Sequence, residues 1–431
     1  MRDLAARLRS IVKQDAARAR STQEPAPLRE LTYVPELDGG RDVGRTAADL
    51  GGVVHSRKSS SCVAIDRVYP ADAWHGRKQI LTCALDAASP ISLYDPRLAA
   101  HAAWADRVVF FDVETTGLSG GAGTLAFVAG CGWFEDDGFR VRQFFLSGPA
   151  DERAMLDALA DVFGAASLLV TFNGRSFDVP VMEMRWAFHR LGAPTDSLAH
   201  FDMLPPARRL WGGGEADCSL SSLERSLFGV HRYGDVPGFE IPTRYFQFLR
   251  TGDARAIEGV LEHNRQDVVS LAAVTAHALA IARDGAEGCE SAGEQLGLGR
   301  LYERVGDAVR AAGAYELAAR ASDRAVRRQA LAGLAVLRRR EHRYDEAAAA
   351  WQDVLDLSML EPASPLSRRA AEALAIHHEH RARDLETARR YAETLGERAT
   401  GRLASEARHR LDRLDRKLTR RAKRDDTGLN F

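Results

Sequence analysis

Acidic side chains that follow apolar strands are the residues of this chain best suited to chemistry. An apolar run, Val108 to Phe111, leads into Asp112 and Glu114. Strand side chains alternate between faces, so these two carboxylates point the same way. Like charges this close are costly unless they are protonated or bind a cation, and their oxygens suit a divalent metal ion. Because a lone Asp-x-Glu is also typical of a strand that ends in a polar turn, the rest of the chain must supply partners.

A third carboxylate, Asp178, follows a second apolar strand at the start of a predicted helix. An acidic residue at that position is often only an N-cap. Asn173, at the end of the strand, and Phe177, beside the acid, are not required for capping. They are residue types that position a substrate backbone and a base, so the segment is a candidate part of the same site.

The fourth candidate carboxylate lies in a long predicted helix, about residues 254–282, with a core stripe of apolar side chains. His263 and Asp267 are four residues apart and share a neighbouring face of that helix. Such a pair is usually a surface hydrogen bond. Here it borders the buried stripe, where the end of a strand could meet it.

Composition gives only broad limits. The chain has 431 residues, 45% of them hydrophobic and 28% charged, with a formal net charge of -1, which neither favours nor excludes nucleic acid. Its five cysteines are scattered without a Cys-x-x-Cys pair, as expected for reduced thiols in a cytoplasmic protein. We expect no membrane span, and residues 1–21 lack the apolar core of a signal peptide.

The elements that would position the four carboxylates form an α/β unit. Three strands in quick succession predict an antiparallel meander, and alternating helices and strands follow it. This order predicts a mixed sheet with helices on its faces. The predicted organisation is a helix and flexible linker at 1–51, a small strand-containing lead-in at 52–105, the α/β domain at 106–284, helical repeats at 290–415 and a basic tail at 416–431.

The C-terminal part is predicted to be all helical and internally repeated. Ala311 and Tyr315 recur as Ala347 and Trp351, an offset of 36 residues. A weaker third copy begins at Arg383. The period is close to the roughly 34 residues of tetratricopeptide repeats, which this region resembles. An irregular helical bundle is the alternative.

Taken together, the segments FDVETTG, NGRSFDVP and HNRQDV resemble the three motifs of DEDD-superfamily 3'-5' exonucleases, which have a ribonuclease H-like fold. More narrowly, GLSGGAGT, FDMLPPARRLW, CSLSSLE and DVPGFEIPTRYFQFLRTGD resemble the YprB-like group of bacterial ribonuclease H-like proteins, whose domain is joined to tetratricopeptide-like repeats. The resemblance covers about residues 106–283.

The resemblance implies a two-metal 3'-5' exonuclease acting on a single-stranded DNA or RNA end. Asp112, Glu114, Asp178 and Asp267 would hold two Mg²⁺ or Mn²⁺ ions, and His263 would be the general base. His263 has the identity of the histidine-type enzymes but the four-residue spacing of the tyrosine type, so another group remains an alternative base. The residues implied at the substrate are Thr115, Thr116, Leu118, Asn173 and Phe177.

Two other functions stay open. One is a non-catalytic nucleic-acid-binding or adaptor protein that acts through its helical repeats, which are also the candidate site for a protein partner. The other is an endonuclease of the same fold, which would also cut a circular substrate. Asp202, a further acid near the site, is expected outside the metal shell.

Overall fold

The computed structural model describes residues 42–85, 89–100, 107–117, 123–212, 217–358, 364–396 and 401–426. Contacts divide the chain into Met1–Arg41 and Asp42–Phe431, and only the second unit contains described residues. The predicted N-terminal helix therefore lies outside the described part, as do most of the predicted linker and Leu118.

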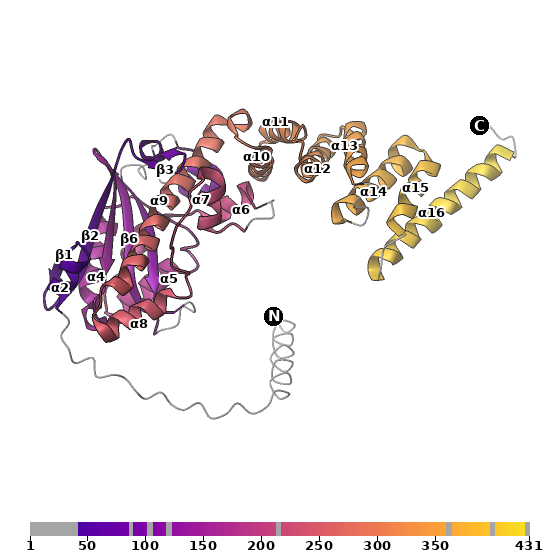
Figure 1. Cartoon of the computed structure of the whole chain (residues 1–431). Helices are drawn as coiled ribbons and strands as arrows, with labels where there is room; N and C mark the ends of the chain where they lie inside the picture. The colour runs from indigo at the N-terminus through magenta and orange to yellow at the C-terminus, as the bar shows by residue number, and fades with distance from the viewer. Residues whose placement is uncertain are drawn as a thin grey trace, which may run out of the picture. The chain divides into compact units, whose positions relative to one another are not determined.

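A seven-stranded mixed sheet is the centre of the N-terminal half (Figure 1). In sheet order its strands are β1 (Val53–Arg57), β2 (Ser60–Pro70), β7 (Gly138–Phe145), β6 (Ala126–Glu135), β5 (Val108–Thr115), β8 (Leu168–Thr171) and β9 (Ala199–Asp202). As predicted, β5, β6 and β7 form an antiparallel meander, whereas β8 and β9 run parallel to β5. The predicted α/β fold class is confirmed.

The segment predicted as a separate lead-in supplies two strands of this sheet. β2 pairs with β7, and β1 pairs with β2. The same segment also forms a small hairpin of β3 (Trp74–His75) and β4 (Lys78–Gln79). The domain boundaries of the sequence analysis stay predictions.

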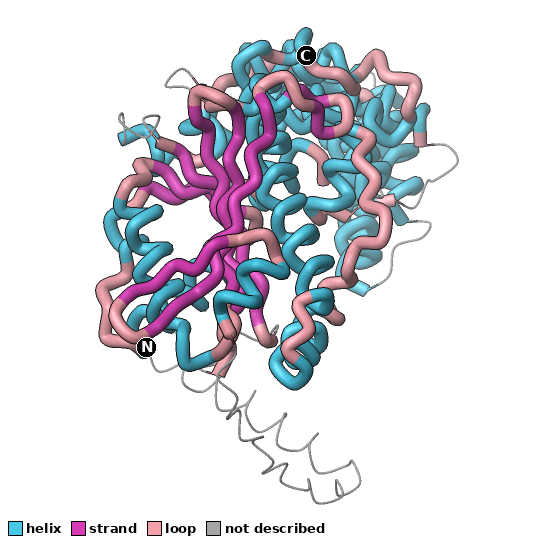
Figure 2. The backbone as a smooth tube through the Cα atoms, turned by 60° about the vertical axis from the view of Figure 1, so that its left-hand side comes forward, coloured by secondary structure: helices cyan, strands magenta, loops and turns pink. Residues whose placement is uncertain are grey.

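Helices cover both faces of the sheet (Figure 2). These are α2 (Val43–Asp49), α4 (Glu152–Gly164), α5 (Asp178–Phe188), α6 (Leu204–Leu210), α7 (Leu220–Phe228), α8 (Ile241–Thr251) and α9 (Arg255–Asp284). Because strand side chains alternate, Phe111 packs in one core cluster and Phe110 in the other. Asp112 and Glu114 therefore lie on the Phe110 face, where α9 crosses β5 and β6.

Two glycines of β6 allow α9 to approach the sheet. A Cβ at Gly130 would lie 2.3 Å from Oδ1 of Asn264, and one at Gly132 would lie 2.5 Å from Val268. Gly130 is also the partner of Asp112 in the β5–β6 ladder. Because Gly130 and Gly132 have no side chain, α9 can pack closely against β6, next to the strand β5 that carries Asp112.

The rest of the described chain is helical, as predicted. Its helices are α10 (Ala292–Val305), α11 (Ala308–Ala318), α12 (Arg324–Arg340), α13 (Tyr344–Leu357), α14 (Pro365–His377), α15 (Leu385–Gly396) and α16 (Gly401–Asp426). Each packs on the next in the chain. Tyr315 is buried between Gly299 and Gly333, where any added Cβ would lie 2.6 Å from its ring. The tetratricopeptide assignment itself stays a prediction.

Among the described residues, no helix combines the length and the apolar character that crossing a membrane requires.

Candidate metal centre and cleft

The predicted carboxylates come from three elements that meet at one edge of the sheet. Glu114 is buried near the end of β5, and Asp112 precedes it on the same face. Asp178 is the first residue of α5 and is buried. Because β5 and β8 are parallel, their carboxyl ends lie at the same edge, so the loop after β8 brings Asp178 to β5.

Helix α9 brings His263 and Asp267 to these strands. The imidazole Nε2 of His263 lies 4.0 Å from Oε1 of Glu114 and 3.6 Å from Oδ2 of Asp267. The four-residue spacing thus places both side chains beside Glu114.

Burial raises the pKa of every carboxyl group of this set, and repulsion from other members of the set adds to this for Asp112, Glu114 and Asp178. Burial is the main cause of the well-raised pKa of Asp112, followed by the charges of Asp267, Glu114 and Asp178. The pKa of Glu114 is also well raised by burial and by Asp267 and Asp178, and that of Asp178 reaches about 7, mainly through burial. The pKa of Asp267 is raised by burial, an effect that Arg232 opposes. Four carboxyl groups that are buried or half-buried and resist ionisation together are suited to a bound cation.

The donor set fits a divalent ion, but the side chains are not arranged around one. Among the described residues, no group of three or more His, Cys, Asp or Glu side chains is placed to hold a metal ion. Two of the carboxylates have other partners: Oδ2 of Asp112 accepts a hydrogen bond from Asn264, and Oδ1 of Asp267 pairs with Arg232. To bind a metal ion, Asp112 and Asp267 must therefore either share their oxygens between the ion and these partners or give up the contacts with Asn264 and Arg232.

Asp235 determines which nitrogen of His263 faces the carboxylates. Oδ1 of Asp235 lies 2.7 Å from Nδ1 of His263. A carboxylate accepts only, so Nδ1 carries the proton. Nε2, on the side of Glu114 and Asp267, is then free of a proton when the imidazole is neutral.

Asp202 supports the loop before Asp178. Its carboxylate accepts hydrogen bonds from the backbone N–H groups of Asn173, Arg175 and Leu204 at 2.8, 3.2 and 3.0 Å. Asn173 itself has a positive φ of 69°, a conformation that Asn tolerates better than most residues. The acid expected outside the metal shell thus holds the backbone of the loop.

The residues predicted at the substrate lie in different surroundings. Thr115 donates its hydroxyl proton to the Gly117 carbonyl, and Thr116 accepts from the backbone of Leu125, so both hydroxyls stabilise the turn after β5. Phe177 is half-buried and occupies the N-cap position of α5, without a capping hydrogen bond from its side chain. Leu118 lies outside the described residues.

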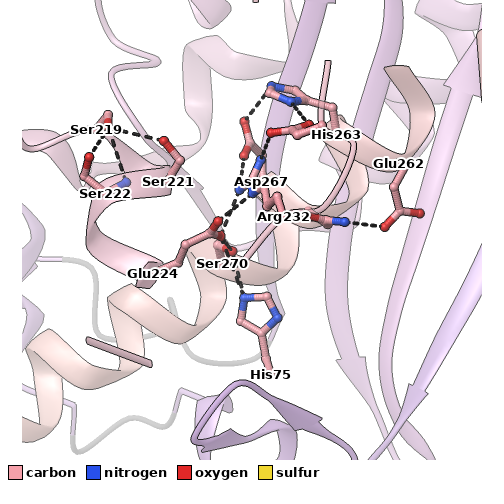
Figure 3. A network of polar contacts seen from close by, with 12 residues as sticks. His75, Ser219, Ser221, Ser222, Glu224, Arg232, Glu262, His263, Asp267 and Ser270 are labelled. Carbon is pink, nitrogen blue, oxygen red and sulfur yellow. Dashed lines mark hydrogen bonds and ion pairs between the residues drawn. The ribbon is translucent and has the colours of Figure 1, made fainter. Parts of the chain in front are cut away.

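A cleft of about 660 Å³ opens beside this edge. Asn173, Arg232, Asp235, His263 and Asp267 are among its lining residues. Figure 3 shows His263 and Asp267 near Arg232, with the Ser219 end of α7 on the other side. Of the four carboxylates, Asp267 is the one that lines this cleft, so the cleft gives a ligand access to Asp267 and His263.

Several residues of the site were not identified from the sequence: Asn264, Gln143, Glu224, Arg232 and Asp235. Asn264 is fully buried and donates to Asp112, while Gln143 donates to Oδ1 of Asn264 at 2.8 Å. Asn264 is next to His263 in the sequence, and Asp235 begins the segment DVPGFEIP. The paired glycines of β6 were the available signal for a helix close to the strand.

Comparison with known proteins agrees with this architecture. Residues 109–279 match the family model of the RNase H superfamily. The protein named "Uncharacterized protein YprB" from Bacillus subtilis (strain 168) is 37% identical over 173 residues, which make up 40% of this chain and 42% of that protein. The chain thus matches less than half of that relative.

Among solved structures, the family B DNA polymerase from the hyperthermophilic archaeon Pyrobaculum calidifontis aligns with a TM-score of 0.30 and 13% identity, covering 55% of this chain and 29% of that chain. A likeness at this TM-score supports no conclusion about function.

Proposed function

We propose that this chain, whose residues 109–279 match the family model of the RNase H superfamily, is a metal-dependent 3'-5' exonuclease that hydrolyses phosphodiester bonds of single-stranded nucleic acid. The superfamily match supports hydrolysis of nucleic acid, and the direction and the exonucleolytic mode are our proposal. The observation that supports it best is the meeting of His263 and Asp267 from α9 with Glu114 from β5.

Asp112, Glu114, Asp178 and Asp267 would hold the Mg²⁺ or Mn²⁺ ions, two in the mechanism we favour. When bound, the ions would make a water molecule more acidic and stabilise the charge on the phosphate. In the unliganded chain the carboxyl groups repel one another, which favours binding of a cation. Partial charge balance is already present, because Arg232 pairs with Asp267.

His263 would accept the proton of the attacking water at Nε2. Asp235 holds the opposite nitrogen, so that Nε2 faces the carboxylates. Asn173, which lines the cleft, and Phe177 would contact the next nucleotide or the edge of the sugar. Thr115, Thr116 and Leu118 would line the pocket of the terminal nucleotide. These substrate roles come from the resemblance to exonucleases of this fold.

The direct test is release of mononucleotides from the 3' end, followed as stepwise shortening of 5'-labelled single-stranded DNA and RNA with Mg²⁺ or Mn²⁺. Asp112→Asn should abolish release, because one metal-binding oxygen is lost. Asp161→Asn, which alters an exposed carboxylate paired with Arg57, should leave it unchanged. Cleavage of circular single strands would favour the endonuclease instead. The proposed enzymatic activity would be refuted if none of these substrates gave a product and Asp112→Asn bound nucleic acid as tightly as the wild type.

A second candidate is nucleic-acid binding through the helical region, supported by two adjoining grooves. One has a volume of about 590 Å³ and the other about 520 Å³, and both are lined by Val336, Arg340 and Arg369. Arg300, Arg328 and Arg339 also line them, against the acidic residues Glu303 and Glu372. Arginines in excess suit a phosphate backbone.

Fluorescence anisotropy of labelled single strands tests this candidate. Replacing both Arg300 and Arg369 by Ala should weaken binding and make its salt dependence less steep. Arg402→Ala, which removes an exposed Arg paired with Glu406 on α16, is the matched control. Unchanged oligonucleotide affinity would leave the grooves to a protein partner of the helical repeats.

A further inference from the structure

A buried arginine, Arg232, is in direct contact with the candidate metal centre. It lies in the loop after α7, and only 6% of its side chain is exposed. Its Nη2 lies 2.6 Å from Oδ1 of Asp267. Its Nη1 lies 3.6 Å from Oδ2 of Asp235, the residue that holds His263. The guanidinium of Arg232 thus contacts Asp267 and lies next to Asp235, the residue that orients the candidate base His263.

Arg232 is held rigidly by a second carboxylate. Glu224, whose side chain is 1% exposed, accepts two hydrogen bonds from it, Nε to Oε1 at 2.5 Å and Nη2 to Oε2 at 2.8 Å. A bidentate pair of this kind fixes the plane of the guanidinium as well as its distance. The orientation in which Arg232 meets Asp267 is therefore set by Glu224.

Glu224 is in turn connected to α9 and to the β3–β4 hairpin. Ser270, one turn beyond Asp267, donates its hydroxyl proton to Glu224. Since that proton is used, Nε2 of His75, 2.8 Å away, donates to the Ser270 hydroxyl. Gly76 allows the hairpin to lie against the end of α7, because a Cβ there would be 2.2 Å from the Phe228 carbonyl oxygen. Figure 3 shows this chain of contacts from His75 to Asp267.

We propose that Arg232 is a positioning residue for the metal centre, an inference that rests on the proposed function. Its charge partly neutralises Asp267, and its ion pair commits Oδ1, so that Asp267 offers a metal ion Oδ2 alone. Oδ2 is also the oxygen that faces Nε2 of His263. Arg232 thereby weakens metal binding and aligns the carboxylate with the candidate base.

Isothermal titration of the metal-free full chain with Mn²⁺ alone tests the charge. Arg232→Gln removes a cation next to the cluster and should raise Mn²⁺ affinity about tenfold, since an opposite charge within 4–6 Å shifts a carboxyl pKa by about 1–3 units. Glu224→Gln keeps Arg232 but removes the negative charge of Glu224 that partly neutralises it. This variant should therefore lower Mn²⁺ affinity. Opposite shifts distinguish an electrostatic role from general damage to the fold.

Cleavage at saturating Mn²⁺ tests the alignment. Arg232→Gln should cut about tenfold or more slowly despite its tighter metal binding, as expected when a group that orients a metal ligand is lost. Arg232→Lys keeps the charge but not the bidentate geometry. It should show nearly normal Mn²⁺ affinity with a reduced rate.

Arg185→Gln is the matched control. Arg185 forms a similar buried bidentate pair with Glu152, at 2.6 and 2.5 Å, away from the cluster. It should lower the melting temperature without changing Mn²⁺ affinity.

Unchanged or weaker Mn²⁺ binding by folded Arg232→Gln, or equal effects of Arg185→Gln, would overturn the role of Arg232. If the wild-type chain binds Mn²⁺ but does not cleave nucleic acid, only the proposed nuclease activity is contradicted. The Mn²⁺ affinities of the variants still test the role of Arg232. Failure of wild type to bind Mn²⁺ would contradict both.

Discussion

The carboxamide of Asn264 donates two hydrogen bonds to Asp112, one to its backbone carbonyl at 3.1 Å and one to Oδ2 at 2.8 Å. The same amide accepts from Gln143, which also donates to the Leu261 carbonyl at 2.8 Å. The fully buried amide of Asn264 thus connects Asp112 to α9, the helix that also carries Asp267.

Asn264→Ala should therefore affect both stability and activity. It leaves the amide of Gln143 with one partner fewer and frees the Asp112 carboxylate, and we expect a loss of about 1–3 kcal/mol in the free energy of unfolding. Nucleotide release should fall more than tenfold at saturating Mn²⁺, because Asp112 is no longer oriented. Urea unfolding and single-turnover cleavage measure the two effects. A stable variant with full activity would show that Asn264 does not position Asp112.

Gly130→Ala should disturb the same contact from the side of the sheet. The added Cβ would lie 2.3 Å from Oδ1 of Asn264, so the amide or α9 must move. We expect a destabilisation of about 1–3 kcal/mol, typical of overpacking, together with weaker Mn²⁺ binding. Gly164→Ala is the control, because nothing lies within 4 Å of the added Cβ there.

The stability of the metal-free protein should fall as the pH rises from about 4 to about 7. The pKa of Asp178 is raised from 3.8 to about 7 in the folded chain, mainly by burial, and the pKa values of its carboxylate neighbours are raised too. In this interval the folded state binds more protons than the unfolded state, so a higher pH favours unfolding. Thermal melts in EDTA should show a lower Tm at pH 7.5 than at pH 5.5.

Mn²⁺ should reverse this trend. Metal binding needs deprotonated carboxylates, so its stabilisation grows with pH. The double variant Asp112→Asn/Asp178→Asn should lose most of the pH dependence in EDTA and the response to Mn²⁺. A wild-type Tm in EDTA that rises over this pH interval would contradict the repulsion among these groups.

Much of the fold could be predicted because its signals are local. Four apolar residues before Asp112 predict β5, and the apolar stripe of residues 254–282 predicts α9, which spans Arg255–Asp284. The pairing of β2 with β7 was missed, since no local pattern in CVAID identifies a strand partner more than seventy residues away. Residues 52–105 were predicted as a separate lead-in for the same reason: a local pattern does not show which strands pair.

Within the site, the residues with a recognisable spacing were identified and their supports were not. His263 and Asp267 share a helical face by their spacing alone. Arg232 lies in a loop, and its choice of Glu224 and Asp267 as partners depends on how α7 packs against α9. Such contacts are determined by the tertiary structure, and no short motif carries them. The catalytic and metal-binding roles of the identified residues stay predictions.

In the helical region, Glu379→Gln should loosen the attachment of α16. The Glu379 side chain is buried, and it accepts hydrogen bonds from Arg413 at 2.9 and 2.7 Å and from Lys417 at 2.7 Å. Burial alone would raise its pKa, but these partners lower it to about 2. Its stabilisation is therefore present above about pH 4.5 and is lost as the pH falls towards 2.

Hydrogen exchange of α16 at pH 7 measures this attachment. Glu379→Gln should increase exchange, whereas Glu406→Gln, which alters an exposed pair with Arg402, should not. Equal exchange in both variants would mean that Glu379 does not contribute to the attachment of α16.

Asp235→Asn should separate the orientation of His263 from its presence. The carboxylate accepts from Nδ1 at 2.7 Å, whereas an amide can turn its NH₂ group to the ring and favour the tautomer with the proton on Nε2. Nε2 could then no longer accept a proton from water. We expect cleavage about 10- to 100-fold slower at saturating Mn²⁺, close to the effect of His263→Gln. Because both changes act on the same nitrogen, the double variant should be no slower than His263→Gln alone. Additive losses would show that Asp235 acts independently of His263, through Arg232 or through the substrate.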